Sequence, residues 1–180
     1  MDDVYIKKVC AGDRDAFGYF VSKYKDMGFT VAVSVVKDAF TAQEVVQDAF
    51  IKAFRNLSSF SNRSSFRTWF YRIVVNEALM RLKKEKRALI IYTDDLTDEA
   101  ADESTLAALK EEEQVHLINE ALQKLPPKES LVLRLFYLQE ESIKEVCEVT
   151  GWSESNTKVL LHRARKNMLM IMNQSMKSPI

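Results

Sequence analysis

Apolar residues recur in the first half of the chain at three- and four-residue steps, the spacing of one face of an α-helix. The pattern predicts a helix that Asp13 caps and that continues through Gly28. A second helix is predicted to start with a capping box over 41–44. A polar loop over 58–65 follows, and the last helix of this half is expected to run from 66 to about 87.

The stretch that follows lacks helical periodicity and is acidic, which predicts a flexible linker. Beyond it, apolar stripes predict a helix that ends at Pro126-Pro127, a short apolar helix over 131–138, and two helices around 151–153. The expected fold is therefore all-α, with two small helical domains joined by a flexible acidic linker, the second domain containing a helix-turn-helix. The predicted domain, linker and domain have the bounds 1–87, 88–105 and 106–180.

The segment over 142–168 has the most informative spacing. Small Cys147 is followed by Gly151 four residues later and by Thr157 six residues beyond, as two short helices crossing at a tight turn require. Ser153 can cap the second helix. In such motifs the first turns of the second helix enter the major groove, and later basic residues reach phosphates. The spacing thus favours DNA binding over an ordinary helical hairpin with a solvated basic face. Six polar residues of the second helix are expected to face outward: Glu154, Ser155, Lys158, His162, Arg163 and Arg165.

Composition agrees with helices and excludes several classes of protein. Gly and Pro are scarce, with four and three copies, and 47% of residues are apolar. No apolar run approaches the roughly 20 residues of a membrane span, and the acidic start of the chain lacks a signal-peptide profile. Cys10 and Cys147 match no metal or redox motif, so a cytoplasmic protein with reduced thiols and no membrane insertion is expected.

The charges sum to zero but are segregated along the chain. Residues 1–87 carry 16 Lys and Arg against 10 Asp and Glu, residues 88–113 carry one against nine, and residues 114–180 carry nine against seven. Blocks of one sign often mark interaction surfaces or linkers. A basic block, an acidic block and a mildly basic block therefore follow one another along the chain.

Residues 60–72 interleave aromatic, small polar and basic side chains. Single-stranded nucleic acid is bound by this combination, because aromatic faces stack on unpaired bases while cations follow the backbone. A buried stripe of Phe66, Trp69, Phe70 and Ile73 would explain the aromatic residues equally well, so both interpretations stay open. Five cations over 81–87 form a positive field suited to phosphates, although a solvated helix end also favours cations.

No arrangement of residues in the sequence predicts catalysis. A phosphate-binding Gly-rich loop, a His-Glu-x-x-His motif and a nucleophile–base pair are missing, and His162 has no second metal ligand nearby. Asp94 and Asp95 lie in the predicted linker, too mobile to hold a catalytic geometry. The chain is expected not to be an enzyme and to use no metal, cofactor or small-molecule substrate.

Several motifs together resemble the extracytoplasmic-function (ECF) sigma factors. They lie at 12–17, 44–50, 66–73 with Asn76, 125–126, and 162–165 at the end of the helix-turn-helix. Each motif is modestly specific, whereas their order and spacing is highly specific. The resemblance implies a sigma factor that binds core RNA polymerase, directs it to promoters and helps to melt the −10 element.

The resemblance also implies a role for each surface. The helix over 41–57 would dock on the β′ clamp helices of the polymerase through Gln43, Glu44, Gln47 and Asp48. The loop and helix after it would capture and melt the −10 element through Phe60, Asn62, Arg63, Ser64, Trp69, Arg72, Asn76, Arg81 and Lys84. The recognition helix would bind the −35 element through Glu154, Ser155, Lys158, His162, Arg163 and Arg165. Two further implied partners are the β subunit and an anti-sigma factor.

Three places depart from the family pattern. Asn62 stands near a common Gly of the capture loop and tolerates left-handed geometry. Glu129-Ser130 replaces a frequent Tyr-Arg pair, and Thr157 replaces Val, adding a hydroxyl that can bond a backbone carbonyl. The main alternative function is a helix-turn-helix regulator that binds DNA without polymerase, which explains 142–168 but leaves the first half without a role.

Overall fold

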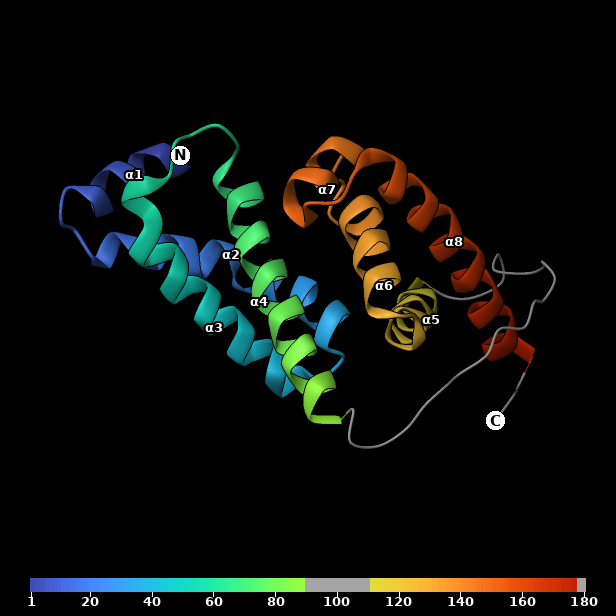
Figure 1. Ribbon diagram of the computed structural model, residues 1–180. Coiled ribbons are helices and arrows are strands. Elements are labelled where there is room, and N and C mark those ends of the chain that lie inside the picture. Colours follow the sequence, from blue (N-terminus) through green and yellow to red (C-terminus); the bar gives the residue numbers. More distant parts are fainter. Residues whose placement is uncertain (90–110, 178–180) are drawn as a thin grey trace.

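The computed structural model describes residues 1–89 and 111–177, and every regular element in these two ranges is helical (Figure 1). The expected all-α fold is confirmed. The predicted linker lies outside the described residues, apart from its first two positions. In the first range the elements are α1 (Asp2–Cys10), the 3₁₀ turn η1 (Asp15–Phe17), α2 (Gly18–Val36), α3 (Ala39–Asn56), the 3₁₀ turn η2 (Leu57–Ser59) and α4 (Phe66–Leu89). In the second they are α5 (Glu111–Lys124), α6 (Pro127–Leu133), the π-helical turn η3 (Arg134–Leu138), α7 (Ile143–Thr150) and α8 (Glu154–Lys177).

In the first half, α2, α3 and α4 pack against one another around fully buried aromatic side chains. Gly28 lies in the middle of α2, which continues through it as predicted. A Cβ at Gly28 would lie only 3.2 Å from Cε1 of Phe70 on α4. The missing side chain therefore lets α2 and α4 approach closely, because interiors packed to this density leave no spare room.

The start of α3 differs from the prediction. Lys37 adopts a left-handed conformation with φ of 64° and ends α2, and α3 begins at Ala39. Asp38 is the N-cap, and its Oδ1 accepts a hydrogen bond of 2.7 Å from the amide of Thr41. The predicted capping box over 41–44 is wrong, because Thr41 lies inside the first turn and contributes its backbone rather than its side chain.

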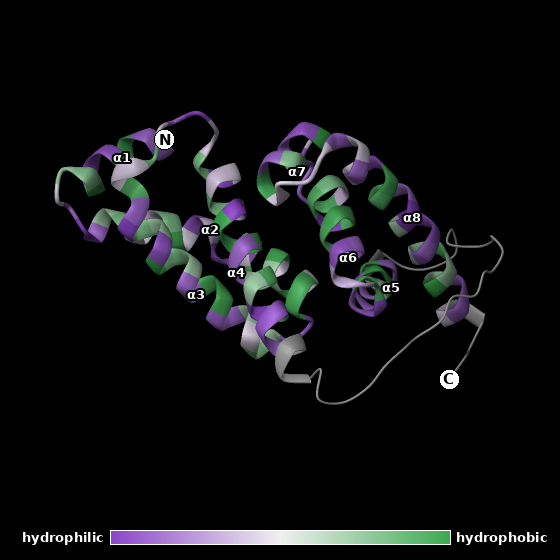
Figure 2. Ribbon diagram, in the orientation of Figure 1, coloured by the Kyte–Doolittle hydropathy of each residue, from purple (hydrophilic) through white to green (hydrophobic). Residues whose placement is uncertain are grey.

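The second half is built around α6 and α8. Pro127 occupies the first turn of α6, where its missing amide hydrogen leaves no helical bond unmade. The predicted apolar helix over 131–138 thus starts earlier and ends in the π-helical turn η3, which buries Leu135 completely. Hydrophobic and hydrophilic residues are interspersed along these helices (Figure 2). Among the described residues, no helix combines the length and the apolar character that crossing a membrane requires.

The two halves of the described chain contact each other, with α4 against α7 and α2 against α6. Lys37 at the end of α2 donates a 2.6 Å hydrogen bond to the carbonyl of Leu122 on α5, and burial lowers the pKa of Lys37 to about 8. Arg67 on α4 forms an ion pair of 2.9 Å with Glu141, which is 4% exposed. Burial raises the pKa of Glu141 above the usual range, against the opposing effect of Arg67. This contact between halves was not predicted from the sequence.

Candidate nucleic-acid interfaces

The helix-turn-helix forms as the spacing predicted. Ser142 and Glu145 make a reciprocal capping box that starts α7, and Gly151 ends α7 with a φ of 74°. The Ser153 hydroxyl accepts from the amide of Asn156 in the first turn of α8. These local bonds fix the angle at which α8 leaves the turn.

Thr157 holds the two helices of this motif together. Its side chain is fully buried and its Oγ1 lies 3.3 Å from the Cys147 thiol. The same hydroxyl donates a 3.0 Å bond to the Ser153 carbonyl, as expected for a Thr in place of Val. Because the hydroxyl has hydrogen-bond partners, its burial does not carry the free-energy cost of an unpaired polar group.

The outer face of α8 carries the predicted polar residues, and all six are exposed. Glu154 and Lys158, one turn apart, form an ion pair of 2.6 Å. This hydrogen bond raises the pKa of Lys158 and lowers the pKa of Glu154, so both stay charged. Ser155 and His162 lie beside them on the same helix. The first turns of α8 therefore offer donors and acceptors that nothing in the core requires.

Val159 is a candidate that the sequence reasoning missed. It lies one turn after Ser155 on α8 and is 65% exposed. In major-groove recognition an apolar side chain at such a place contacts the methyl group of thymine. The signal was present in the sequence, because Val159 falls outside the buried stripe of Leu160, Leu161 and Ala164.

Two predicted phosphate contacts have partners inside the protein. Arg163 forms an ion pair of 2.7 Å with Glu129, whose other oxygen accepts a 2.8 Å bond from Asn167. Glu129 is 2% exposed, so the carboxylate that departs from the family pattern ties α6 to α8. Arg165 donates a 2.6 Å bond to the Tyr137 hydroxyl. Their predicted contact with DNA phosphates stays a prediction.

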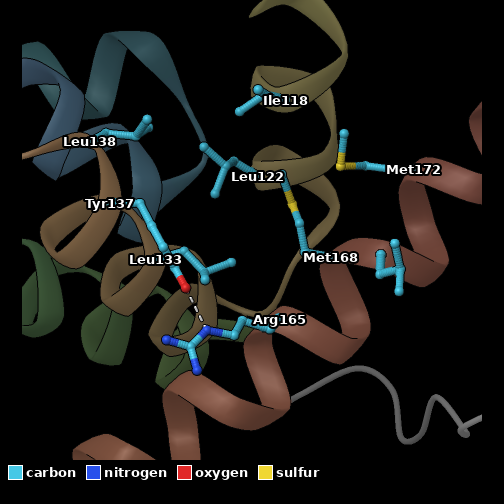
Figure 3. A pocket seen from close by; sticks show the side chains of 9 residues that line it. Ile118, Leu122, Leu133, Tyr137, Leu138, Arg165, Met168 and Met172 are labelled. Carbon is cyan, nitrogen blue, oxygen red and sulfur yellow. Dashed lines mark hydrogen bonds between the residues drawn. The ribbon is translucent and has the colours of Figure 1, made fainter. Parts of the chain in front are cut away.

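Arg165 also borders an apolar hollow of about 370 Å³ between α5, α6, η3 and α8 (Figure 3). Figure 3 shows the bond from Arg165 to Tyr137 beside Leu133 and Met168. Apolar side chains make up most of the lining: Ile118, Leu122, Leu133, Leu138, Met168, Leu169 and Met172. Such a surface suits a protein partner better than a phosphate backbone.

The start of α4 and the loop before it form the second candidate interface. Asn62 adopts a φ of 53°, the left-handed geometry expected where the family commonly has Gly. Ser65 caps α4 by accepting from the amide of Thr68 at 3.0 Å. The loop therefore turns sharply and presents exposed Arg63 and half-buried Ser64 beside the helix.

The two interpretations of the aromatic residues apply to different rings. Phe66 and Phe70 are 2% and 0% exposed and belong to the core. Phe60 and Trp69 are only half-buried, and their rings lie 5.0 Å apart between centroids. Trp69 shares one face of α4 with exposed Arg72 and Asn76, at steps of three and four residues. This face combines an accessible aromatic ring with a cation, as single-strand binding requires.

Arg81 belongs to a different side of α4 from that face. It lies five residues after Asn76 and forms an ion pair with Glu44 on α3. Exposed Met80, missed by the sequence reasoning, continues the Trp69 face instead, and Lys84 is exposed further along. The structure thus brings Trp69, Arg72 and Asn76 together and places Arg81 beside the predicted polymerase contacts.

The predicted polymerase contacts lie on the outer side of α3. Gln43, Gln47 and Asp48 are exposed, and Glu44 is half-buried by its pairing with Arg81. A groove of about 390 Å³ runs between α2 and α3 next to them, lined by Val21, Lys25, Asp26, Phe29, Gln43, Val46, Gln47 and Phe50. Exposed apolar side chains at Phe40, Ile51 and Phe54 extend this surface along α3. Exposed apolar residues gathered beside polar ones are typical of a protein docking surface.

Comparisons with known proteins give a consistent result over most of the chain. The profile of sigma-70 region 2 matches residues 20–88, and that of sigma-70 region 4 matches residues 116–168. The ECF RNA polymerase sigma factor SigW of Bacillus subtilis is 31% identical, over 89% of this chain and 91% of the relative. The ECF RNA polymerase sigma-E factor of Escherichia coli K12 is 30% identical, over 92% and 91%.

Two solved structures share the fold. The sigma factor RpoE of Bartonella quintana, in complex with the anti-sigma factor NepR, matches with a TM-score of 0.67 at 19% identity, covering 87% of this chain and 96% of that one. CnrH, in complex with the cytosolic domain of CnrY, matches with a TM-score of 0.64 at 20% identity, covering 95% and 96%.

Proposed function

The chain belongs to the ECF sigma factors, which direct RNA polymerase to promoters, and on that premise we propose how its surfaces divide the work. Residues 1–87 bind core polymerase and the −10 element, and residues 106–180 bind the −35 element. The observation that carries this division is the presence of two unlike surfaces. One combines a half-buried Trp69 with Arg72, and the other is a recognition helix with exposed polar side chains.

The −10 element is bound as a single strand by the loop over 58–65 and the exposed face of α4. Trp69 and Phe60 offer ring faces on which an unpaired base can stack, and Arg63 and Arg72 lie close enough to follow the backbone. Asn62, Ser64, Asn76 and Lys84 add polar contacts along the same surface. Because stacking favours the unpaired state, binding energy alone stabilises the melted element.

The −35 element is bound as a duplex by the first turns of α8. Ser155, Lys158 and Val159 reach base edges, with Glu154 controlling the position of the Lys158 ammonium group through their ion pair. His162 contacts the DNA backbone next to these base pairs. Arg163 and Arg165 contact phosphates through their remaining N–H groups, while their Nε atoms stay bonded to Glu129 and Tyr137.

Polymerase docks on α3 through Gln43, Glu44, Gln47 and Asp48 beside the groove between α2 and α3. The apolar hollow bordered by Arg165 is a second protein-binding surface, which we assign to the β subunit. An anti-sigma factor is a further partner by likeness to the solved complex with NepR. ECF sigma factors are not a family of enzymes, and this chain acts in the cytoplasm by binding alone, without cofactor or substrate.

Docking on polymerase is tested by reversing one exposed charge. Asp48→Arg should leave folding intact, because Asp48 lies outside the core, and should lower core binding at least tenfold in a pull-down. Asp3→Arg on α1 makes the same charge change as a control and should bind core normally. Run-off transcription with core polymerase then measures promoter use. Normal core binding by Asp48→Arg would remove α3 from the proposed docking surface.

A regulator that binds DNA without polymerase remains distinguishable by the same experiment. Such a protein would bind promoter duplex through α8 but would not be retained by core polymerase. Core retention together with promoter-dependent transcripts supports the sigma factor mechanism, whereas duplex binding without either supports the regulator.

A further inference from the structure

The loop before α7 contacts α4 through polar groups beside the proposed −10 surface. Arg67 pairs with buried Glu141 at 2.9 Å and also donates to the backbone carbonyl of Gln139. The hydroxyl of fully buried Tyr71 donates to the side chain of Gln139. Tyr71 directly precedes Arg72, so these bonds place the loop before α7 along one edge of the exposed face of α4.

Two polar hollows, which are open surface pockets, lie along the seam between the halves, the interface where α4 meets α7 and the loop before α7. One of about 300 Å³ is lined by Ser64, Ser65, Thr68, Ser142, Lys144, Glu145 and Glu148. The other, of about 250 Å³, brings Glu148 together with Arg63, Ser64, Thr68, Trp69 and Arg72. Four of the residues around Glu148 are ones to which we assign −10 contacts. A carboxylate of α7 therefore shares a hollow with the groups that would bind a DNA strand.

The charges across this seam are complementary. Residues 139–148 contain four carboxylates and one lysine. Glu145 and Glu148 lie three residues apart on one side of α7, and Glu141, in the loop before α7, is close enough to Glu145 to interact with it. Arg63, Arg67 and Arg72 lie on the opposite side of the seam. An acidic row facing arginines reproduces the charge that a phosphate backbone would present.

The same contact is incompatible with binding both promoter elements. The −10 and −35 elements lie about 25 base pairs apart, which is about 85 Å of duplex. Helix α7, with eight residues, is only about 12 Å long, and α8 begins three residues after it. A recognition helix held this close to α4 cannot reach the −35 element while α4 holds the −10 element, so the halves have to separate.

We propose that α7 and the loop before it act as an internal competitor of promoter DNA, covering the edge of the −10 surface in the free protein until the two halves part. The proposal rests on the proposed function of the α4 face. If about nine-tenths of the molecules are closed at equilibrium, the protein binds single-stranded DNA about tenfold more weakly than the open form does, because only the open molecules can bind.

The test uses Glu141→Lys in the full-length protein, which places a second cation against Arg67 in a buried site. Glu140→Lys is the matched control, since it makes the same charge change at the neighbouring exposed position. Two quantities are measured for each variant: the radius of gyration by small-angle X-ray scattering, and the affinity for a labelled single-stranded DNA of mixed sequence. Glu141→Lys should expand the protein and bind about tenfold more tightly than Glu140→Lys.

The alternative outcomes separate the possible failures. If Glu141→Lys is expanded but binds single-stranded DNA no better than Glu140→Lys, α7 does not compete with DNA. If Glu141→Lys is not expanded and its binding is unchanged, this contact does not close the protein. Either result overturns the proposal. If circular dichroism shows that Glu141→Lys is unfolded, Gln139→Ala takes its place, because it removes the acceptor of Tyr71 and adds no charge. Adding Trp69→Ala to the open variant should abolish the gain, and a gain that survives would instead refute the proposed −10 surface.

Discussion

The two candidate DNA surfaces of this sigma factor are built in different ways. On α8, Ser155 and Lys158 are exposed and lie outside the buried core. On α4, Trp69 is half-buried, and its ring lies 5.6 Å from the buried ring of Phe66. Ser155 and Lys158 can therefore change without affecting the fold, whereas side chains at the start of α4 serve the core and the DNA surface together. Duplex preference should vary more freely than the capacity to melt DNA.

The largest expected effect is that of Trp69→Ala, which tests this dual role. Loss of the indole should lower single-strand affinity by about 1–3 kcal/mol, the contribution of one stacked base. The free energy of unfolding should also fall, because Phe60 and Phe66 lose a packing partner. Urea unfolding and promoter opening by the polymerase complex measure the two losses. Asn76→Ala, at an exposed site on the same face, should lower binding without changing stability, and equal stability losses for both variants would break the comparison.

Lys158→Ala should lose a similar amount of DNA affinity but no stability, so its total effect is smaller. The variant should lose roughly 1–3 kcal/mol of −35 affinity and relax the preference at one or two base pairs, because Lys158 suits the acceptor edge of guanine. Its melting temperature should match that of the parent, since Lys158 is exposed and its ion-pair partner Glu154 is exposed as well. Selections on randomised −35 duplexes measure the preference. An affinity loss that leaves the selected sequence unchanged would assign Lys158 to a phosphate instead of a base.

The smallest effect is expected for Val159→Ala. Removing two methyl groups from a side chain that meets a thymine methyl should weaken binding by about 1 kcal/mol. Replacing that thymine by deoxyuridine should cause a similar loss in the parent and a much smaller further loss in the variant. Deoxyuridine scanning of the −35 duplex with both proteins makes this measurement. If the affinity losses from Val159→Ala and from deoxyuridine simply add, Val159 contacts no thymine methyl group.

Helices with a clean apolar stripe could be predicted from the sequence, and so could the turn of the helix-turn-helix. Gly151 has the positive φ that its place after Cys147 implied, and Asn62 has the left-handed geometry expected of the capture loop. These features depend on contacts within a few residues, which spacing and residue type report directly. The six outward residues of α8 could be predicted for the same reason.

Features that depend on distant partners could not be predicted. Glu129, Glu141 and Arg67 look like surface residues in the sequence, yet the two carboxylates are almost fully buried because a cation from another element meets each of them. The start of α3 was misplaced because both Asp38 and Thr41 are good capping residues, and only the backbone conformation selects Asp38. Helix α1 was not predicted, although Asp2 anchors it by accepting bonds from Tyr19 and Tyr24.

The burial of Glu141 against Arg67 has a consequence for how a free sigma factor spends its time in a cell. A bacterial chromosome presents on the order of 10⁶ or more nonspecific sites, and any protein with open basic surfaces is distributed among them. A factor whose arginines face its own carboxylates is held less by this excess of DNA, so more of it diffuses freely to meet polymerase. The chromosome and RNA polymerase compete for each sigma factor molecule. The contact between Arg67 and Glu141 biases this competition toward polymerase, although it involves neither competitor.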